Sequence, residues 1–360
     1  MNRQKLHRFC IALMILASFV RLAGQVETYL AAQHASALWR VDIAPSAVPL
    51  VHETSVPVSA GVSQQADKPA AQSVSPPLLP EEASQEPLEG AAPDTPEVGE
   101  SSPSAAWAFQ TEEADAISVT GSCTYSFDKQ ALLLRPSALD FSMDGPKVLI
   151  VHTHASEAYT PEPGFTYEAS DFLRTQDETY SVIRIGSEIA RILEDAGIET
   201  IHDTTHNDYP SYDGAYARMQ TIIEGYLAQY PSIQIVLDVH RDAVEDDTGF
   251  PAALTAGVEG EECAKLMLVV GTDEGGLSHP DWQENLANAL KLQALLNRAA
   301  PGLCRNIDLR TERFNQHERP GSMLCEFGAS GNTLRQALRT SRIFAGALIA
   351  LIEGCQAGEP

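Results

Sequence analysis

The sequence lacks several signals that would assign it to a common class of protein. Its six cysteines form no C-x-x-C pair, which argues against a zinc ribbon and a thioredoxin-like redox site. It has no glycine-rich phosphate loop, no G-x-S-x-G nucleophile elbow and no mixed basic and aromatic patch. Basic residues are scarce, with 24 Lys and Arg against 49 Asp and Glu in 360 residues, a formal charge of −25. Because so acidic a chain repels phosphate backbones, we expect no nucleic acid among its partners.

Residues 1–25 have the layout of an N-terminal membrane anchor or secretory signal. Three basic residues precede an apolar run over residues 9–20 and a fourth follows it: Arg3, Lys5, Arg8 and Arg21. A basic flank ahead of a short apolar core is typical of an export signal or a short signal anchor. No clear small-x-small cleavage site follows. We therefore favour an uncleaved single-pass anchor with an extracytoplasmic domain, and a buried helix of a soluble domain is the alternative.

Residues 26–115 are expected to form a juxtamembrane segment followed by a disordered, acidic, proline-rich linker. From about residue 44 the composition is dominated by Pro, Ser, Ala, Glu and Val, with almost no aromatic residues. Such a segment buries too little apolar surface to offset the entropy lost on ordering. It would allow a tethered domain to reach some distance from the membrane.

Residues 120–360 have the pattern of a catalytic α/β domain. Short apolar runs predict buried strands, and apolar residues three and four apart predict amphipathic helices. Strands and helices alternate, which predicts a three-layer domain with a largely parallel sheet. The expected strands are residues 147–151, 198–201, 233–239, 266–271 and 322–327, and the expected helices are 182–196, 216–227, 281–298 and 334–352.

Residues from two of the strand ends form a typical ligand set for catalytic zinc. In parallel α/β sheets, chemistry is found just beyond the carboxyl ends of the strands. His154 and Glu157 follow the first strand with H-x-x-E spacing, and His240 follows the strand 233–239. Two imidazoles and a carboxylate would hold Zn²⁺ and leave a position for water. His152 and Asp177 compete with Glu157 for the third ligand position. As alternatives, His152 could bond the backbone and Asp177 could be a helix-start charge.

Two further residues are candidates for catalysis. Glu326, in the strand 322–327, is expected to act as a general base and to return the proton to the leaving amine. Arg241 could hold an oxyanion or a substrate carboxylate, and its alternative is an ion pair with Asp238 or Asp242. Either aspartate could instead orient the second nitrogen of the neighbouring histidine.

Other polar and sulfur-containing residues are weaker candidates. His202, His206 and Asp208 lie in one loop and could form a second metal site, although packing roles are more usual for such residues. Cys325 precedes Glu326 in a strand, so its side chain should point to the opposite face and belong to the core.

Four motifs, in order along the chain, resemble the stage II sporulation protein P family. They are VLIVHTHASEAYTP, VLDVHRDA, RFNQHERPG and LCEFGASGNTLRQALRTS, and the resemblance extends over about residues 147–351. It implies a zinc-containing N-acetylmuramoyl-L-alanine amidase fold, related to zinc carboxypeptidase domains. It also implies a membrane-anchored peptidoglycan hydrolase that acts in engulfment at the sporulation septum. The family is further credited with endopeptidase activity and with a lytic transglycosylase partner, stage II sporulation protein D.

The resemblance also assigns roles to individual residues. It places the motif histidines at His152, His154 and His240 and the acidic catalytic position at Glu326. Further polar positions near the site fall on Asn315, Gln316 and Asn332. The alternatives are a zinc carboxypeptidase-type wall peptidase, with a closed pocket and an arginine for the terminal carboxylate, and a non-catalytic scaffold of a septal complex.

Overall fold

The structure is a computed structural model that describes residues 108–357. The expected anchor and nearly all of the expected linker therefore lie outside the described residues. Among residues 108–357, no helix is long and apolar enough to cross a bilayer. The folded region starts before residue 120, since Ala114 and Ile117 are buried in the hydrophobic core. The sequence hides this start because these two residues stand among acidic neighbours.

The helices and strands alternate through most of the described chain. The strands are β1 (Val119–Gly121), β2 (Val148–Val151), β3 (Thr200–His202), β4 (Ile235–Asp242), β5 (Thr255–Val258), β6 (Glu261–Ala264), β7 (Leu266–Gly271), β8 (Ile307–Arg310) and β9 (Gly321–Ala329). The helices are α2 (Thr111–Ala116), α3 (Lys129–Leu134), α4 (Val182–Asp195), α5 (Ala215–Gln229), α6 (Trp282–Ala299), the 3₁₀ turn η2 (Gln316–Glu318) and α7 (Leu334–Gln356).

Local signals explain where the longer helices begin and end. The Ser181 hydroxyl caps α4 by accepting a hydrogen bond from the amide of Ile183. Gly197, with a φ of +79°, allows the chain to leave this helix in a left-handed turn. Thr333 and Gln336 form a reciprocal capping box at the start of α7. These signals agree with the boundaries expected from the sequence.

Seven strands form one mostly parallel sheet in the order β1-β8-β7-β9-β4-β2-β3. Neighbouring strands are parallel throughout, except that β7 and β9 are antiparallel. The α/β class and the largely parallel sheet are thus confirmed. The antiparallel contact divides the sheet into two parallel blocks that point in opposite directions. As a result, the carboxyl ends of β2, β4 and β9 share an edge with the amino ends of β7 and β8.

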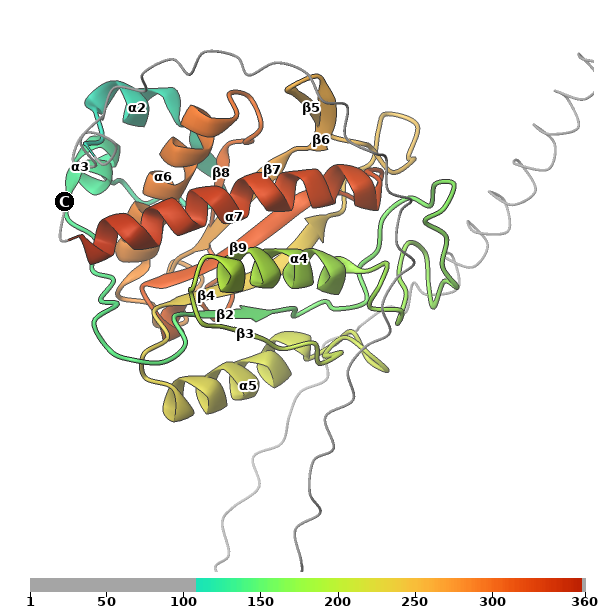
Figure 1. Cartoon of the computed structure of the whole chain (residues 1–360), viewed down its shortest axis with the longest axis horizontal. Helices are drawn as coiled ribbons and strands as arrows, with labels where there is room; N and C mark the ends of the chain where they lie inside the picture. Colours follow the sequence, from blue (N-terminus) through green and yellow to red (C-terminus); the bar gives the residue numbers. More distant parts are fainter. Residues whose placement is uncertain (1–107, 358–360) are drawn as a thin grey trace, which may run out of the picture. The chain divides into compact units, whose positions relative to one another are not determined.

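The two faces of the sheet are covered unequally. Helices α4, α6 and α7 pack on one face, and Figure 1 shows α7 lying between α4 and α6. On the other face, α5 packs on Leu149 and Val151 of β2 and on Val236 of β4. Val148 and Ile150 of the same strand point to the opposite core, as the alternation of a strand requires. Over β9, β7 and β8 this second face is hollowed into a cavity instead.

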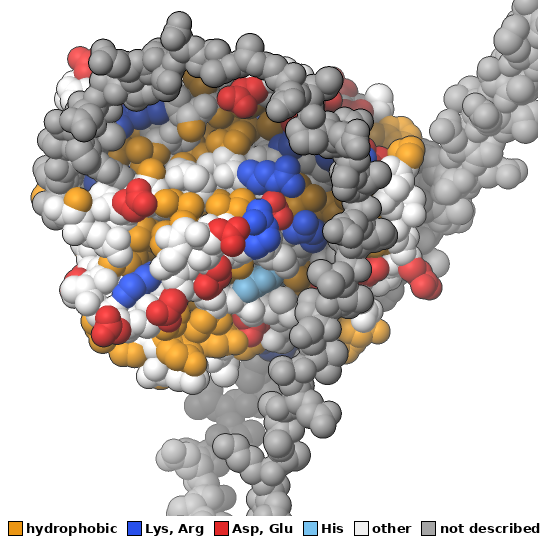
Figure 2. Space-filling model, viewed as in Figure 1, with side chains coloured by type: hydrophobic (Ala, Val, Ile, Leu, Met, Phe, Trp, Pro, Cys, Tyr) orange, Lys and Arg blue, Asp and Glu red, His pale blue; other side chains and the backbone are white. Residues whose placement is uncertain are grey.

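Basic side chains gather on the helical face between α4 and α7 (Figure 2). Arg184, Arg191 and Arg342 all contact the carboxylate of Glu188, which is buried. Burial acts to raise the pKa of Glu188, but hydrogen bonds from Arg342 and Arg191 prevail and lower it. Arg342 of α7 therefore fastens that helix to α4, while Arg184 and Arg191 pair with Glu188 within α4.

A buried lysine in α6 should make the stability of the fold depend on pH. Lys291 is 2% exposed and donates one hydrogen bond, from Nζ to the carbonyl of Leu132, over 3.2 Å. Burial, with the nearby charge of Arg135, lowers its pKa from 10.5 to about 8. Between these two values the unfolded chain binds more protons, so the wild type gains stability as the pH rises from about 8 to 10.5. Over this pH range, we expect the free energy of unfolding of the wild type, measured with urea, to increase by about 2–3 kcal/mol relative to that of Lys291→Met. A difference between the two proteins that is the same at pH 7 and pH 10 would contradict this prediction.

Candidate active site

His154, His240 and Glu326 meet where β2, β4 and β9 end. His240 is the direct cross-strand partner of Glu326, so both side chains project from the same face of the sheet. His154 lies three residues beyond β2 and is buried, as is His240. Cys325 points the other way into the core, as expected from the sequence.

The two imidazoles are close enough to share one ion. Their ring centroids are 5.4 Å apart and the rings are nearly perpendicular. Zinc lies about 3 Å from the centroid of an imidazole that binds it, so rings up to about 6 Å apart can bind the same ion. Nδ1 of His154 is buried and makes no hydrogen bond. Burial and the neighbouring His240 lower the pKa of His154 to about 4, which keeps its ring neutral, as a metal ligand must be.

Glu157 is the carboxylate that lies beside His240 in this group. Its Oε2 lies 3.4 Å from Nδ1 of His240 and accepts a hydrogen bond from the backbone amide of Arg241. A separation of 3.4 Å is long for a hydrogen bond, but two ligands of tetrahedral zinc are about 3.4 Å apart. Burial acts to raise the pKa of Glu157, but His240 and Arg241 outweigh it and lower the pKa to about 2. The carboxylate is therefore ionised at neutral pH.

Asp238 supports this group from the same strand as His240. Its carboxylate accepts hydrogen bonds from the amide (2.8 Å) and hydroxyl (2.6 Å) of Thr153. Oδ1 also lies 2.8 Å from Nε2 of His240, but this contact lacks the alignment of a hydrogen bond. Of the two aspartates considered from the sequence, Asp238 is the one placed to orient His240. Asp242 pairs with Arg305 at 2.6 Å.

Glu326 lies beside these residues, at one end of the cavity on the uncovered face. Its Oε2 is buried and has no hydrogen-bond partner. Burial raises its pKa to about 8; Glu157 and Asp242 add to the rise, and His240 opposes it. A carboxyl group that exchanges a proton near neutral pH suits a general base and acid.

The donor set fits a zinc ion, although the side chains are not already arranged as one. Among residues 108–357, no group of three or more His, Cys, Asp or Glu is arranged to hold a metal. The unpartnered Nδ1 of His154, the neighbouring imidazole of His240 and the ionised Glu157 nevertheless provide the nitrogen and oxygen donors that zinc prefers.

Two residues proposed as ligands lie outside this group. Both ring nitrogens of His152 are used, with Nδ1 3.0 Å from the carbonyl oxygen of Val239 and Nε2 2.8 Å from Nε2 of His202. His152 therefore takes the alternative role of packing beneath the site. Asp177 is exposed and accepts a hydrogen bond from the amide of Thr179. It belongs to the turn before α4, and the structure does not bring it to the two histidines.

The guanidinium of Arg241 is bound to the protein backbone. The residue is buried, and its guanidinium donates to the carbonyls of Ala158 (2.9 Å) and Leu173 (3.1 Å). The expected role in holding an oxyanion is therefore not supported, because these donors are occupied. Neither does it pair with Asp238 or Asp242 through their carboxylates. Instead it fastens the loop that follows β2.

Sequence reasoning missed an aromatic and arginine group around His154. Tyr212 stacks on the His154 ring at 4.3 Å, and Tyr216 meets its edge at 5.5 Å. Arg174 lies over Tyr212 and binds Asp208 at 2.8 Å. The signal was the run DYPSYDGAY, which leads into the first turn of α5 and whose tyrosines follow a loop already rich in polar residues. Asp208 acts in packing here, as its bond to Arg174 shows.

The polar positions given by the resemblance shape the surroundings of the site. The Gln316 side chain accepts from the amide of Gly271 and donates to the carbonyl of Val269, which extends the ladder of β7. Asn315 donates to the carbonyl of Tyr216 and so positions α5. Asn332 bonds Leu254 and the end of β9. All three residues position backbone.

Comparisons with known proteins agree with the motifs. The family model for Stage II sporulation protein P (SpoIIP) matches residues 53–349. Stage II sporulation protein P of Bacillus subtilis (strain 168) is 25% identical over 210 residues, covering 55% of this chain and 49% of that protein. The chain thus matches about half the length of this curated relative.

Distant similarity to solved amidase structures is also found. The N-acetylmuramoyl-L-alanine amidase AmiC2 of Nostoc punctiforme is 14% identical with a TM-score of 0.33, over 58% of this chain and 97% of that one. The amidase Ami1 from Mycobacterium abscessus is 13% identical with a TM-score of 0.35, over 59% and 100%. Since the family model spans well over half of the sequence, this chain belongs to the stage II sporulation protein P family.

Proposed function

We propose that the domain is a zinc-dependent N-acetylmuramoyl-L-alanine amidase that hydrolyses the amide bond between glycan and stem peptide in peptidoglycan. The observation that carries this proposal is the convergence of buried, unpartnered atoms. Nδ1 of His154 and Oε2 of Glu326 are these atoms, and with the imidazole of His240 they form one strand-end cluster beside a substrate-sized cavity. Buried polar groups without partners are rare in folded proteins, and a catalytic role is one explanation of such a group.

In this mechanism each residue has a distinct task. His154, Glu157 and His240 would hold the zinc ion, and Asp238 would fix the orientation of His240. When bound, zinc supplies a Lewis acid that acidifies water and polarises the scissile carbonyl. Glu326 would take the proton of the attacking water and transfer it to the nitrogen of the leaving amine.

The alternative of a carboxypeptidase is less well supported. Such an enzyme needs a closed pocket with an arginine directed at the terminal carboxylate. The guanidinium of Arg241, the residue that kept this option open, is bound to backbone carbonyls. The cavity beside Glu326 also runs across several strands of the sheet. An endopeptidase activity on peptide cross-links remains compatible with this open shape.

The cellular setting of the proposal depends on the sequence. The basic-flanked apolar segment of residues 1–25 would anchor the chain in the cell membrane, with the catalytic domain outside the cytoplasm at the sporulation septum. The family resemblance supports a lytic transglycosylase partner, stage II sporulation protein D. In that arrangement one enzyme would cut glycan strands and the other would remove their peptides.

Metal removal tests the proposed chemistry directly. The full-length protein is incubated with purified peptidoglycan, with and without a chelator, and the products are separated as muropeptides. We expect free stem peptides and peptide-free glycan, lost with chelator and restored by Zn²⁺. Hydrolysis that continues after complete removal of the metal would refute the zinc mechanism. Cleaved cross-links without free stem peptides would identify an endopeptidase instead.

A further inference from the structure

The cavity beside Glu326 forms a groove on the part of the sheet that α5 leaves uncovered. It has a volume of about 660 Å³. Met267 and Val269 of β7 lie opposite Glu326 and Leu324 of β9, so these four side chains share one face. The groove continues onto β8 and β1, and its remaining lining residues are Thr120, Tyr216, Asp242, Lys265, Cys304, Arg305, Asn306, Asp308, Arg310 and Phe314.

The length of the groove fits a short extended peptide. From β9 to β1 there are three strand spacings of about 4.8 Å, or about 14 Å in all. Four residues of extended peptide span about 14 Å as well. The stem peptide of peptidoglycan is three to five residues long, and it leaves from the nitrogen of the bond that Glu326 would help to cleave.

Lys265 is the cation of the groove that pairs with no side chain of the described residues. Among residues 108–357, Lys265 has no ion pair or side-chain hydrogen bond, whereas Arg305 is paired with Asp242 at 2.6 Å. Arg310 contacts Asp308 and Glu312 at 3.4 Å each. The ammonium group of Lys265 is therefore available to pair with an anionic group of a ligand in the groove.

Lys265 is also at the catalytic end of the groove. It directly precedes β7, and its carbonyl accepts a hydrogen bond from the amide of Gly328, two residues beyond Glu326. The second residue of the stem peptide is D-glutamate, which is linked through its side chain and keeps a free α-carboxylate. This carboxylate is about one residue away from the scissile bond, and therefore lies at the same end of the groove.

We propose that the groove binds the stem peptide and that Lys265 recognises the free α-carboxylate of its D-glutamate. This inference rests on the proposed amidase function. It makes Lys265 a specificity residue that distinguishes the free acid from the amidated form of the peptide. The alternative ligand of the groove is the glycan strand. It would need no such cation, because the carboxyl group of the sugar at the cleaved bond is already part of the amide and carries no charge.

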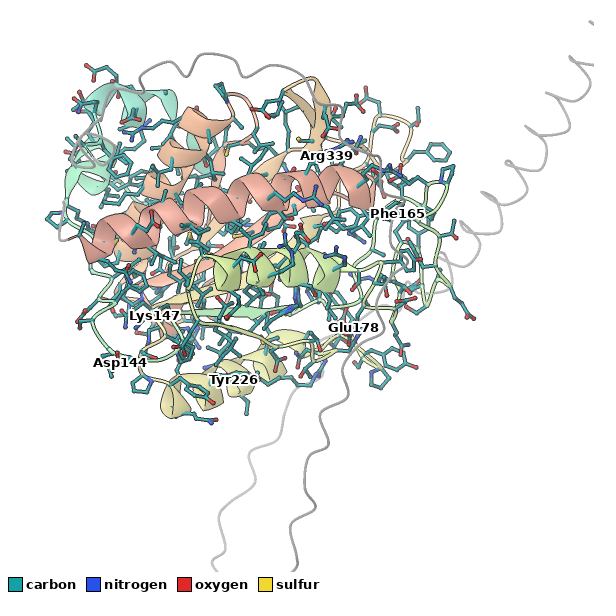
Figure 3. All side chains as sticks on the ribbon, in the orientation of Figure 1. Asp144, Lys147, Phe165, Glu178, Tyr226 and Arg339 are labelled. Atoms are coloured by element: carbon teal, nitrogen blue, oxygen red, sulfur yellow. The ribbon has the colours of Figure 1, made fainter. Side chains whose placement is uncertain are left out.

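The test compares Lys265→Met with Lys147→Met in the full-length protein. Lys147 lies just before β2, at the opposite edge of the sheet, where it is labelled in Figure 3. Both substitutions remove one ammonium group. The substrates are muramoyl tetrapeptides with D-glutamate or with its α-amide. For Lys265→Met we expect KM to rise roughly tenfold on the free acid, with kcat and the amidated substrate little changed. Lys147→Met should behave as wild type on both substrates.

A binding measurement separates this inference from the proposed function. Calorimetry with the free tetrapeptide should show roughly tenfold weaker binding after amidation for wild type, and equal binding of both forms for Lys265→Met. If wild type hydrolyses neither substrate but shows this binding difference, the amidase function fails and the subsite stands. The proposed subsite would be contradicted if Lys265→Met raised KM equally for both substrates, or if this variant no longer bound peptide-free glycan.

Discussion

Glu326→Gln should lower the rate of amide hydrolysis by about 10³-fold, which is typical when a general base is removed. Glutamine keeps the shape of the side chain but cannot accept the proton of the attacking water. The substitution should not harm the fold. Burial raises the pKa of Glu326 to about 8, so in the metal-free protein its carboxyl group is largely neutral at pH 7. A neutral amide replaces it at little cost, and zinc binding should remain.

The measurements for this variant are the rate of release of stem peptide, zinc content and thermal unfolding. The stability difference has a defined sign, because the raised pKa means that the folded protein binds more protons than the unfolded chain. Wild type therefore loses stability relative to Glu326→Gln as the pH rises from 4.5 to about 8. Glu178→Gln is the matched control, since this glutamate is exposed and forms a long ion pair with His206, at 3.8 Å. A Glu326→Gln protein with wild-type activity would rule out the assignment of Glu326 as base.

Glu157→Gln should weaken zinc binding by more than about 100-fold, whereas Asp177→Asn should leave it unchanged. The loss of a direct ligand should exceed the 10–100-fold effect that is usual for outer-shell residues. The expectation follows from the placement of Glu157 against His240, and from the exposure of Asp177 in the turn before α4. The two substitutions make the same chemical change at the two competing carboxylates.

Zinc affinity is best measured by competition with a chromophoric chelator, with circular dichroism to confirm folding. Some loss of stability is expected for Glu157→Gln alone, because its carboxylate accepts from the amide of Arg241 and contacts Arg174 at 3.6 Å. Binding that is lost in Asp177→Asn and kept in Glu157→Gln would mean that the turn before α4 moves onto the metal. Equal binding in both variants would show that neither carboxylate is a ligand.

Much of the fold could be predicted from the sequence because its signals are local. Residues 147–151 and 266–271 are continuous apolar runs, and both form buried strands. The pattern in residues 182–196 gave α4 almost to the residue. In contrast, β1 and β8 contain polar residues that line the groove, so their pattern is mixed. The antiparallel pairing of β7 with β9 depends on distant contacts, for which the sequence has no local signal.

The candidate site shows the same division. His154, His240 and Glu326 were found because they stand at the ends of apolar strands, and parallel pairing brings such ends together. The role of Arg241 could not be predicted, because its partners are backbone carbonyls of the loop after β2. Backbone atoms are the same for every residue type, so no sequence pattern reveals them. Lys265 was missed because it lies before β7, which runs antiparallel to β9. Candidate residues were expected only at the carboxyl ends of strands, whereas here an amino end lies at the same edge of the sheet.

The reversal at β7 and β9 has an evolutionary consequence. Of the residues that would hold the proposed zinc ion, His154 and Glu157 follow β2 and His240 lies near the end of β4, whereas Lys265 and Arg305 precede β7 and β8. The two sets therefore belong to separate segments, which drift or recombination can alter one at a time. Related chains should keep the first set while the second changes with the chemical modifications of each organism's wall. Exchanging the segments before β7 and β8 between such chains should transfer substrate preference without rebuilding the catalytic centre.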